Sequence, residues 1–334
     1  MKTPVSILSA NSIELHYWFN DDSHTMNALV FNRCEYEFLG IVKELATKLK
    51  VDIEIETEPL ANGGLRSWLK IKSAQGASDA ATISKQALKI AFITYLCTEV
   101  LLTPLTTTLQ IATTHAIEKF FGDPEIRKLK KKKEKAELEY DIAKIEHETK
   151  QLCNTVDENV LKKKKSNYYE TIDNYKKVQD VSISIADNRK QIIFEQKISR
   201  ASFNQYILSS DNLDPDIDEN AVIEIVSPVL KKGKYKWVRI YNGEVIQFSM
   251  KSNEFKTLVQ TGKIEFKNGS SIECLLIVNK KINSEGDVKT TGYDVTMVDK
   301  YFENNTPVET PEGRQKRQKK EAEKQQMKLF NDYE

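Results

Sequence analysis

The side chains that most often hold metal ions or move protons are sparse in this sequence and lie far apart. Its histidines are His16, His24, His115 and His147, and its cysteines are Cys34, Cys97, Cys153 and Cys274. No histidine stands four residues from another histidine or from a cysteine, and no pair of cysteines has C-x-x-C spacing. Because a zinc or iron site needs at least three converging ligands, the sequence predicts no metal site and no cofactor.

One turn collects groups that could carry acid–base chemistry. Asp21, Asp22 and His24 follow Asn20 directly. The same residues are common in turns, where their side chains bond to the backbone, and turn formation explains them more simply. The sequence holds no glycine-rich phosphate loop and no G-x-S-x-G elbow. We therefore expect a non-catalytic protein, while a catalytic set assembled from distant residues would leave no such signature.

Aromatic and basic residues are interleaved in one short segment. Tyr235, Trp237 and Arg239 alternate along a predicted strand and so share one face, and Lys232 and Lys234 stand just before it. If that face points outward, the rings could stack on bases and the cations could bind phosphates, as in a single-strand nucleic-acid binder. If it points inward, Trp237 belongs to the core. Aromatic residues on strands usually pack, which favours the core.

A short peptide near the C-terminus resembles a known docking motif. Gln326-Met327-Lys328-Leu329-Phe330 is similar to the pentapeptide by which bacterial polymerases, repair proteins and mobile-element proteins bind the DNA sliding clamp. The resemblance implies that Gln326 hydrogen-bonds at the mouth of the clamp's pocket and that Met327 fills a shallow subsite. It also implies that Leu329 and Phe330 enter the apolar pocket, as a few buried anchors on a mobile segment. Lys328 departs from the small or acidic residue often found there. The alternative is a helix end that folds back onto its own domain.

The predicted helices and strands that carry these residues indicate an α+β chain of several modules. Residues 1–72 read as a small α/β sheet module: an alternating strand from Ile13 to Phe19, a helix over 35–50 with one apolar stripe, and strands over 51–56 and 65–71. Residues 73–86 are small and polar, which is typical of a linker.

Residues 87–121 form the most apolar segment of the chain. Its charged residues are Lys89, Glu99, Glu118 and Lys119. Only Ile90–Leu102 is continuously apolar apart from Glu99, which is shorter than the ~20 residues that a membrane-spanning helix needs. Two interpretations stay open. The segment is a buried helical hairpin in a globular core, or it inserts into a membrane whose cytoplasmic side the following lysines would face.

The rest of the chain divides into a charged helical region over 122–210, a β-rich domain over 211–303 and a tail over 304–334. In the helical region, Leu138, Ile142, Ile145 and Leu152 give at most two heptads, so a coiled coil, and a homo-oligomer through it, is only one option. The β-rich domain predicts a small barrel with a hairpin turn at Asn242-Gly243 and a strand order similar to the oligonucleotide-binding (OB) barrel. The tail predicts a disordered, solvated segment, helical in part.

Composition limits the function classes further. The 334 residues hold 50 Lys and Arg against 49 Asp and Glu, so the whole chain has no basic excess for nucleic acid or an anionic membrane. Scattered cysteines and a polar start predict a cytoplasmic protein, with the inner face of a membrane as the alternative. Our leading hypothesis is an interaction protein that docks on a sliding clamp or similar partner through Gln326–Phe330. A membrane-associated effector and a single-strand nucleic-acid binder are the alternatives.

Overall fold

The structure is a computed structural model, and it divides the chain into two compact units. Unit 1 comprises Met1–Ser209 and Ser284–Asp287, and unit 2 comprises Ser210–Asn283 and Val288–Glu334. The described residues are 9–21, 25–58, 65–74, 80–107, 109–124, 126–127, 140, 143–144, 147, 158–187, 189–229, 235–241, 243–267, 269–303 and 306–331, without the side chains at 58, 80–86, 109–110 and 325–331. Each unit is described by itself.

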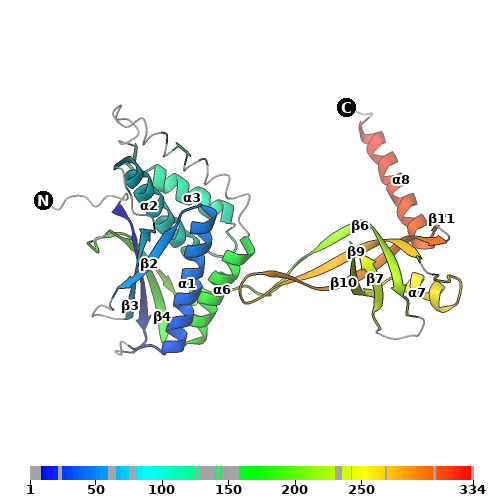
Figure 1. The fold of residues 1–334 in the computed structure, drawn as a ribbon, viewed down its shortest axis with the longest axis horizontal. Helices are drawn as coiled ribbons and strands as arrows, with labels where there is room; N and C mark the ends of the chain where they lie inside the picture. The colour runs from blue at the N-terminus through cyan, green and yellow to red at the C-terminus, as the bar shows by residue number, and fades with distance from the viewer. Residues whose placement is uncertain are drawn as a thin grey trace. The chain divides into compact units, whose positions relative to one another are not determined.

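Unit 1 is an antiparallel sheet covered by helices (Figure 1). Its strands are β1 (Ser12–Phe19), β2 (Ile53–Glu58), β3 (Leu65–Ser73), β4 (Val178–Ala186) and β5 (Ile192–Ser199), in the spatial order β2-β3-β1-β4-β5. Its helices are α1 (Ala28–Lys48), α2 (Ala80–Leu102), α3 (Leu109–Phe121) and α6 (Glu158–Asn174), followed by a short 3-10 helix η3 (Arg200–Tyr206). This confirms a mixed α/β chain.

The predicted alternation in β1 decides which face meets the helices. Ile13, Leu15 and Tyr17 are fully buried in one hydrophobic core with residues of all four α-helices. α1 begins after Asn27, whose side-chain oxygen accepts the amides of Leu29 and Val30, as an N-cap does. The apolar stripe of α1 faces the same core. Local patterns therefore produce the first strand and helix where they were predicted.

The sheet extends further along the sequence than the predicted N-terminal module. β1 pairs with β3 on one edge and with β4 on the other, joining Ile13 to both Leu69 and Ile185. β4 lies within the segment assigned to a charged helical region, yet it is a strand beside the centre of the sheet. One core therefore unites the segments assigned separately to 1–72, 87–121 and 122–210, because β1 lies between β3 from the first of them and β4 from the last.

Residues 87–121 lie largely inside this core, as the buried-hairpin interpretation predicts. α2 and α3 contact each other, and Phe92, Phe120 and Phe121 form one aromatic cluster with ring centroids 5.2–5.5 Å apart. Glu99 is buried but lies 3.4 Å from the Lys119 ammonium, which offsets its charge. Among the described helices, none is long and apolar enough to cross a membrane.

Unit 2 contains a closed five-stranded barrel. Its strands are β6 (Asn212–Ser227), β7 (Trp237–Tyr241), β8 (Glu244–Met250), β9 (Ser271–Ile282) and β10 (Val288–Glu303), and helix α7 (Asn253–Gln260) lies between β8 and β9 in sequence. The sheet order β10-β8-β7-β6-β9 closes through a second pairing of β9 with β10. β8 and β10 are parallel, and the other barrel pairs are antiparallel. This confirms the predicted barrel domain.

The predicted hairpin turn and two further turn and cap residues have the roles that their residue types favour. Gly243, at the predicted hairpin turn, has φ +83° and connects β7 to β8. Ser252 caps α7 by accepting the amide of Phe255 at 3.0 Å. Gly262, with φ +70°, follows the last turn of α7. Such left-handed positions favour glycine, which explains why these turns were visible in the sequence.

The shared face of Trp237 and Arg239 points into the barrel. Trp237 packs against Phe248, Phe255 and Phe266 with centroid distances of 5.8–6.3 Å, so it is a core residue. Arg239 is fully buried as well, and its guanidinium lies 4.8–5.2 Å from three aromatic rings, Tyr241, Phe248 and Tyr293. Tyr235, just before β7, is exposed instead. Trp237 and Arg239 are therefore not part of an outer stacking platform.

Arg239 is held by rings rather than by hydrogen bonds. None of its three guanidinium nitrogens has a hydrogen-bond partner among the residues that the structure describes. Burial lowers the pKa of the guanidinium from its usual value. Loss of hydration costs a buried cation several kcal/mol, and cation–π contacts of about 2 kcal/mol each offset much of that cost. The planar group is thus retained mainly for packing between rings.

This arrangement predicts opposite results for two substitutions at Arg239. Arg239→Met fills similar space without a charge, so we expect unfolding free energy at least equal to that of the parent. Arg239→Lys keeps a charge but loses the flat group, and we expect a loss of about 2 kcal/mol. Denaturant titration of both variants, followed by Trp237 emission, measures the difference. A Met variant less stable than the Lys variant would show that the charge has a partner.

Candidate functional site

The chain after the barrel is a strand followed by a long helix, rather than a disordered tail. β11 (Thr306–Glu309) pairs with β10, and α8 (Pro311–Asn331) runs from there to the region of the predicted docking peptide (Figure 1). Few apolar residues occur here, so the helix is fixed by polar contacts in its first turns. These contacts form the root of α8, which we define as Thr310, Glu312, Gly313, Lys316 and their partners on the barrel.

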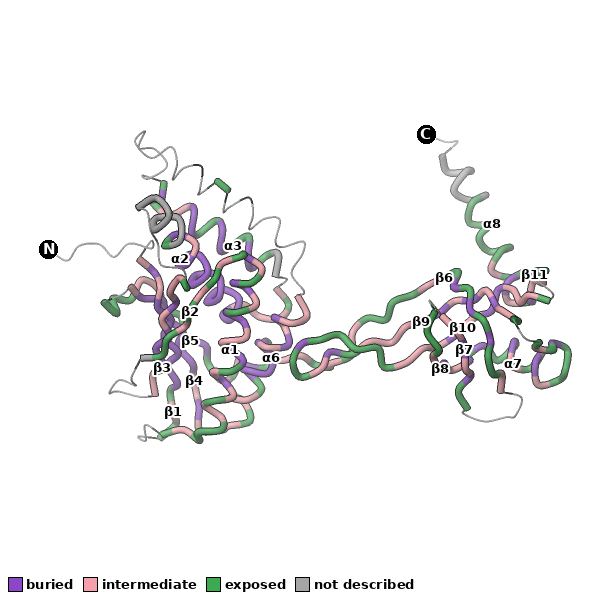
Figure 2. The backbone as a smooth tube through the Cα atoms, in the orientation of Figure 1, coloured by how far each residue is buried: buried purple, intermediate pink, exposed green. Residues whose placement is uncertain are grey.

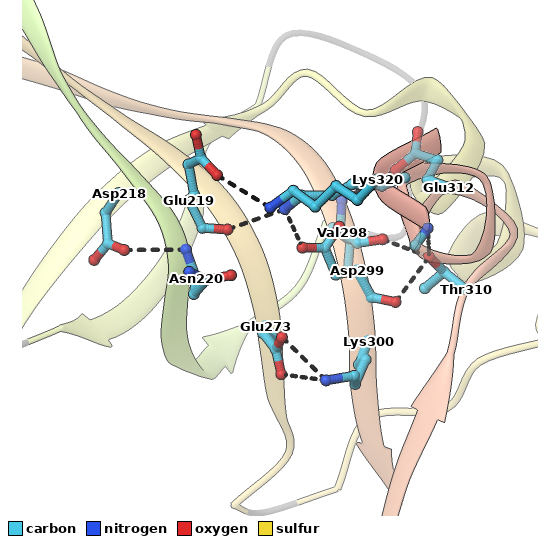
Figure 3. Close-up of polar contacts among 12 residues, drawn as sticks. Asp218, Glu219, Asn220, Glu273, Val298, Asp299, Lys300, Thr310, Glu312 and Lys320 are labelled. Carbon is cyan, nitrogen blue, oxygen red and sulfur yellow. Dashed lines mark hydrogen bonds and ion pairs between the residues drawn. The ribbon is translucent and has the colours of Figure 1, made fainter. Parts of the chain in front are cut away.

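Thr310 caps the helix and ties it to β10. Its hydroxyl accepts the amide of Gly313 at 3.0 Å and donates to the carbonyls of Val298 and Asp299 (Figure 3). Its own amide also donates to the Asp299 carbonyl, at 3.0 Å. Pro311 follows at the first helical position, where a missing N–H costs nothing. Thr-Pro is the local signal from which the start of α8 could have been predicted.

Gly313 lets the first turn of α8 lie directly against β10. A Cβ atom at this position would stand 2.1 Å from the Asp299 carbonyl oxygen, far inside van der Waals contact. Any other residue therefore requires the helix or the strand to move. Glycine inside a helix lowers its stability by ~1 kcal/mol relative to alanine. At position 313 it allows the two backbones to approach closely, which accounts for its presence.

Glu312 links α8 to the other helix of the barrel. Its carboxylate accepts the Ser252 hydroxyl at 2.8 Å and the backbone amide of Val298 at 3.0 Å. Ser252 is also the N-cap of α7. A negative charge near the first turns of two helices is favourable, because unpaired amides give each N-terminus a partial positive charge. This one side chain therefore fastens β10, α7 and α8 together.

Lys316 forms the one largely buried ion pair at the root. Its ammonium contacts the Asp299 carboxylate and donates to the Glu219 carbonyl at 3.1 Å. The two charged side chains are only 16% and 10% exposed, so the pair is screened little by solvent. Lys320, one turn later, reaches the Glu219 carboxylate at 3.4 Å but is exposed (Figure 3). The hold on α8 thus weakens along its length.

Surface ion pairs add little to this anchorage. Arg317 contacts Glu309 through two nitrogens at 3.0 and 3.3 Å, and its hydrogen bond lowers the pKa of the Glu309 carboxyl. Such exposed pairs contribute little to stability, because water screens their attraction. The buried contacts of Thr310, Glu312 and Lys316 therefore set the direction of α8.

The predicted docking peptide follows the exposed part of this helix in sequence. After Lys316, the described side chains of α8 are exposed through Lys324 (Figure 2). The backbone at positions 326–330 continues the helix. The side chains of Gln326, Met327, Leu329 and Phe330 lie outside the described residues. The backbone of the predicted peptide thus comes after two exposed, polar turns of α8.

The other candidate residues stay apart. His16 is buried in the sheet, while His115 and His147 are exposed, and Asp21 pairs with Lys177 at 3.4 Å. Asp22, His24, Lys232, Lys234 and Cys153 are not among the described residues. Within the described part of the chain, no group of three metal-ligating side chains converges. Cys34, Cys97 and Cys274 are free and buried.

Comparison with protein-family models, with curated proteins and with solved structures finds no match to this chain. A functional argument therefore depends on the geometry of its own residues.

The root of α8 predicts an unusual result for a glycine substitution. Gly313→Ala would ordinarily stabilise a helix by ~1 kcal/mol, but here the added methyl meets the β10 backbone. We expect faster hydrogen exchange in the first two turns of α8 and a barrel destabilised by about 1–3 kcal/mol. Gly292→Ala in β10 is the matched control, because a Cβ there meets nothing within 4 Å. Equal behaviour of the two variants would rule out the close approach.

Proposed function

We propose that this protein is a docking protein that binds a DNA sliding clamp, or a partner with a similar apolar pocket, through the end of α8. The observation that carries the proposal is the exposed helix with a fixed root. α8 is held at Thr310, Glu312 and Lys316 and is exposed from Arg317 to Lys324. Two apolar anchors, Leu329 and Phe330, follow in a segment that is otherwise polar.

The exposed turns of α8 are better suited to binding a partner than to stabilising the barrel. Its exposed turns add no buried apolar surface to the barrel, so stability alone does not account for them. A stem whose direction is fixed loses less conformational freedom when its end binds, which improves affinity. Leu329 and Phe330 would act as the central anchors, with Gln326 and Met327 beside them.

A binding measurement with purified sliding clamp tests this proposal. Leu329→Ala combined with Phe330→Ala removes both anchors, and we expect the dissociation constant to rise at least about 30-fold, corresponding to ~2 kcal/mol. Lys324→Ala, on the exposed stem, should stay within two-fold of the parent. Biolayer interferometry with the full chain gives both values. Unchanged affinity of the double variant would exclude this peptide as the contact.

A second candidate, single-strand nucleic-acid binding by the barrel, is favoured by its topology. We infer that the barrel is of the OB type, because its ring β9-β6-β7-β8-β10 has a parallel β8–β10 pair and a helix between β8 and β9. OB barrels bind oligonucleotides over their second and third strands and the adjoining loops. The second and third strands here are β7 and β8.

The exposed aromatic residue on that side is Tyr235. It is 63% exposed and stands two residues before β7, beside Lys236 and shortly after Lys232 and Lys234. Trp237 and Arg239 contribute from inside, by holding β7 in place. Of the five residues predicted from the sequence, Trp237 and Arg239 therefore no longer belong to the candidate binding surface.

Replacement of Tyr235 tests the barrel as an oligonucleotide site. Loss of one stacking ring costs ~1–3 kcal/mol, so Tyr235→Ala should weaken binding of a fluorescein-labelled oligonucleotide by about 5- to 150-fold. Fluorescence anisotropy measures this, and Val222→Ala, an exposed position on β6 and therefore outside those two strands, serves as the control. Equal affinities of parent and Tyr235→Ala would remove the barrel from consideration.

A further inference from the structure

The sheet of unit 1 has a second face that the hydrophobic core does not use. Residues that are paired across antiparallel strands point to the same side. His16 is paired with Arg66 on β3 and with Ser182 on β4, and Ser182 is paired with Lys197 on β5. Since the neighbouring residues Leu15 and Tyr17 enter the core, this row points away from the helices. A polar and aromatic row thus crosses the four strands.

An adjacent row runs parallel to the first. Glu14 is paired with Trp68 on β3 and with Ser184 on β4. Trp18 lies at the other side of the first row, opposite Asp180. We call these two rows, together with Trp18, the polar face. Its aromatic residues lie on β1 and β3, which are neighbouring strands inside the sheet.

Each tryptophan of the polar face has a cation over its ring. The Lys197 ammonium lies 4.4 Å from the Trp18 centroid, and Lys190 lies 5.2 Å from that of Trp68. The His16 ring lies beside that of Trp18, with centroids 4.0 Å apart. Trp18 is 38% exposed, whereas Trp68 is buried. Trp18 is therefore the ring that a planar ligand could reach.

Most of the polar face is closed to solvent, since Glu14, His16, Ser182 and Ser184 are buried, and not all of its hydrogen-bonding groups have partners. The Ser184 hydroxyl is fully buried and has no partner among the described residues, and neither has the Arg66 Nε. Arg66 does contact Glu14 through Nη1 at 3.2 Å. Burial lowers the pKa of His16 to about 4, with Arg66 and Lys197 adding to the effect. The imidazole is thus neutral at pH 7, with one donor and one acceptor nitrogen.

We propose that the polar face binds single-stranded nucleic acid, with Trp18 stacking on a base and Lys197 moving from the ring to a phosphate. Four of the five strands, in the order β2-β3-β1-β4 with helices on the opposite face, resemble the four-stranded sheets that stack bases on their aromatic rings, and β5 extends the sheet beyond β4. An exposed cation–π contact is weaker than the stacking of a base, so the exchange at Trp18 is favourable. This site is separate from both sites proposed above.

The charges of the polar face predict a weak dependence on salt. Arg66 is paired with Glu14, and Lys197 is paired with Asp180 at 2.9 Å, so few cations are available for phosphates. With one or two phosphates neutralised on a single strand, affinity should fall only about three- to seven-fold between 50 and 200 mM salt. Stacking, rather than charge, is then the larger part of the binding.

Trp18 variants in the full chain provide the test, with labelled oligo(dT) and oligo(rU) of fifteen nucleotides as probes. We expect both probes to bind, Trp18→Ala to weaken binding at least five-fold, and Trp18→Phe, which keeps a ring, to stay within about two-fold. Tyr140→Ala is the matched control, because Tyr140 is another exposed ring of unit 1. A preference between the two probes would identify RNA or DNA as the ligand.

Two further readouts keep the test independent of folding defects and of the barrel. Trp68 and Trp237 are buried, so quenching of tryptophan emission by oligonucleotide should disappear in Trp18→Phe. Lys197→Glu should weaken binding while leaving the ring in place. If neither probe binds, or if parent, Trp18→Ala and Lys197→Glu bind with equal affinities, the proposal is overturned. An effect of Tyr235→Ala alone would assign binding to the barrel and overturn it too.

Discussion

The pairing of β1 along both edges is the constraint on which unit 1 depends. Its neighbours β3 and β4 are separated in sequence by α2, α3 and α6, yet they meet β1 at the same residues, for example at Ile13. Side chains on a strand alternate, so this register sends Leu15 to the helices and His16 to the polar face. A slip of one residue would place Glu14 and His16 in the core. The core and the polar face are thus fixed by the same pairing.

In unit 2 the corresponding constraint is the contact between two backbones at Gly313. A helix with so few apolar residues cannot be held by hydrophobic burial, so hydrogen bonds from Thr310 and Glu312 must hold it. Buried hydrogen bonds are directional, and they fix the angle of α8 as well as its position. Exposed pairs such as Arg317–Glu309 could not do this, because solvent screens them. The helix is therefore rigid at its root and polar along its stem.

Local patterns in the sequence predicted local structure well. Alternation predicted β1, an apolar stripe predicted α1, and the Asn-Gly turn predicted the β7–β8 hairpin. Pairing partners were not predictable, since β4 joins β1 across more than a hundred residues. The apolar run in α2 could likewise be interpreted either as a buried helix or as a membrane segment. A helix packed against a sheet and other helices is apolar on most sides, as is a membrane segment.

The candidate sites could be predicted only in part from the sequence, because their side chains come together from several strands. Alternation correctly put Trp237 and Arg239 on one face, but no pattern shows that a guanidinium can be buried among rings. The polar face was missed because Glu14, His16 and Trp18 alternate with apolar residues, as in any half-exposed strand. These residues form a candidate site only together with Arg66 and Lys197, which lie on other strands of the sheet. The resemblance of Gln326–Phe330 to a docking motif, in contrast, depends on adjacent residues alone and needs no partner strand.

Weak binding at the polar face is compatible with the function proposed for α8. Non-specific nucleic-acid affinities are on the order of 1–100 μM at physiological salt. A protein held on a DNA-bound partner meets nucleic acid at an effective concentration on the order of 1 mM, which would fill about nine-tenths of such sites. Neither site then needs high affinity by itself. The chain has 50 basic and 49 acidic residues, so its net charge attracts free nucleic acid only weakly. Binding at the polar face would then depend on the partner, which brings the nucleic acid close.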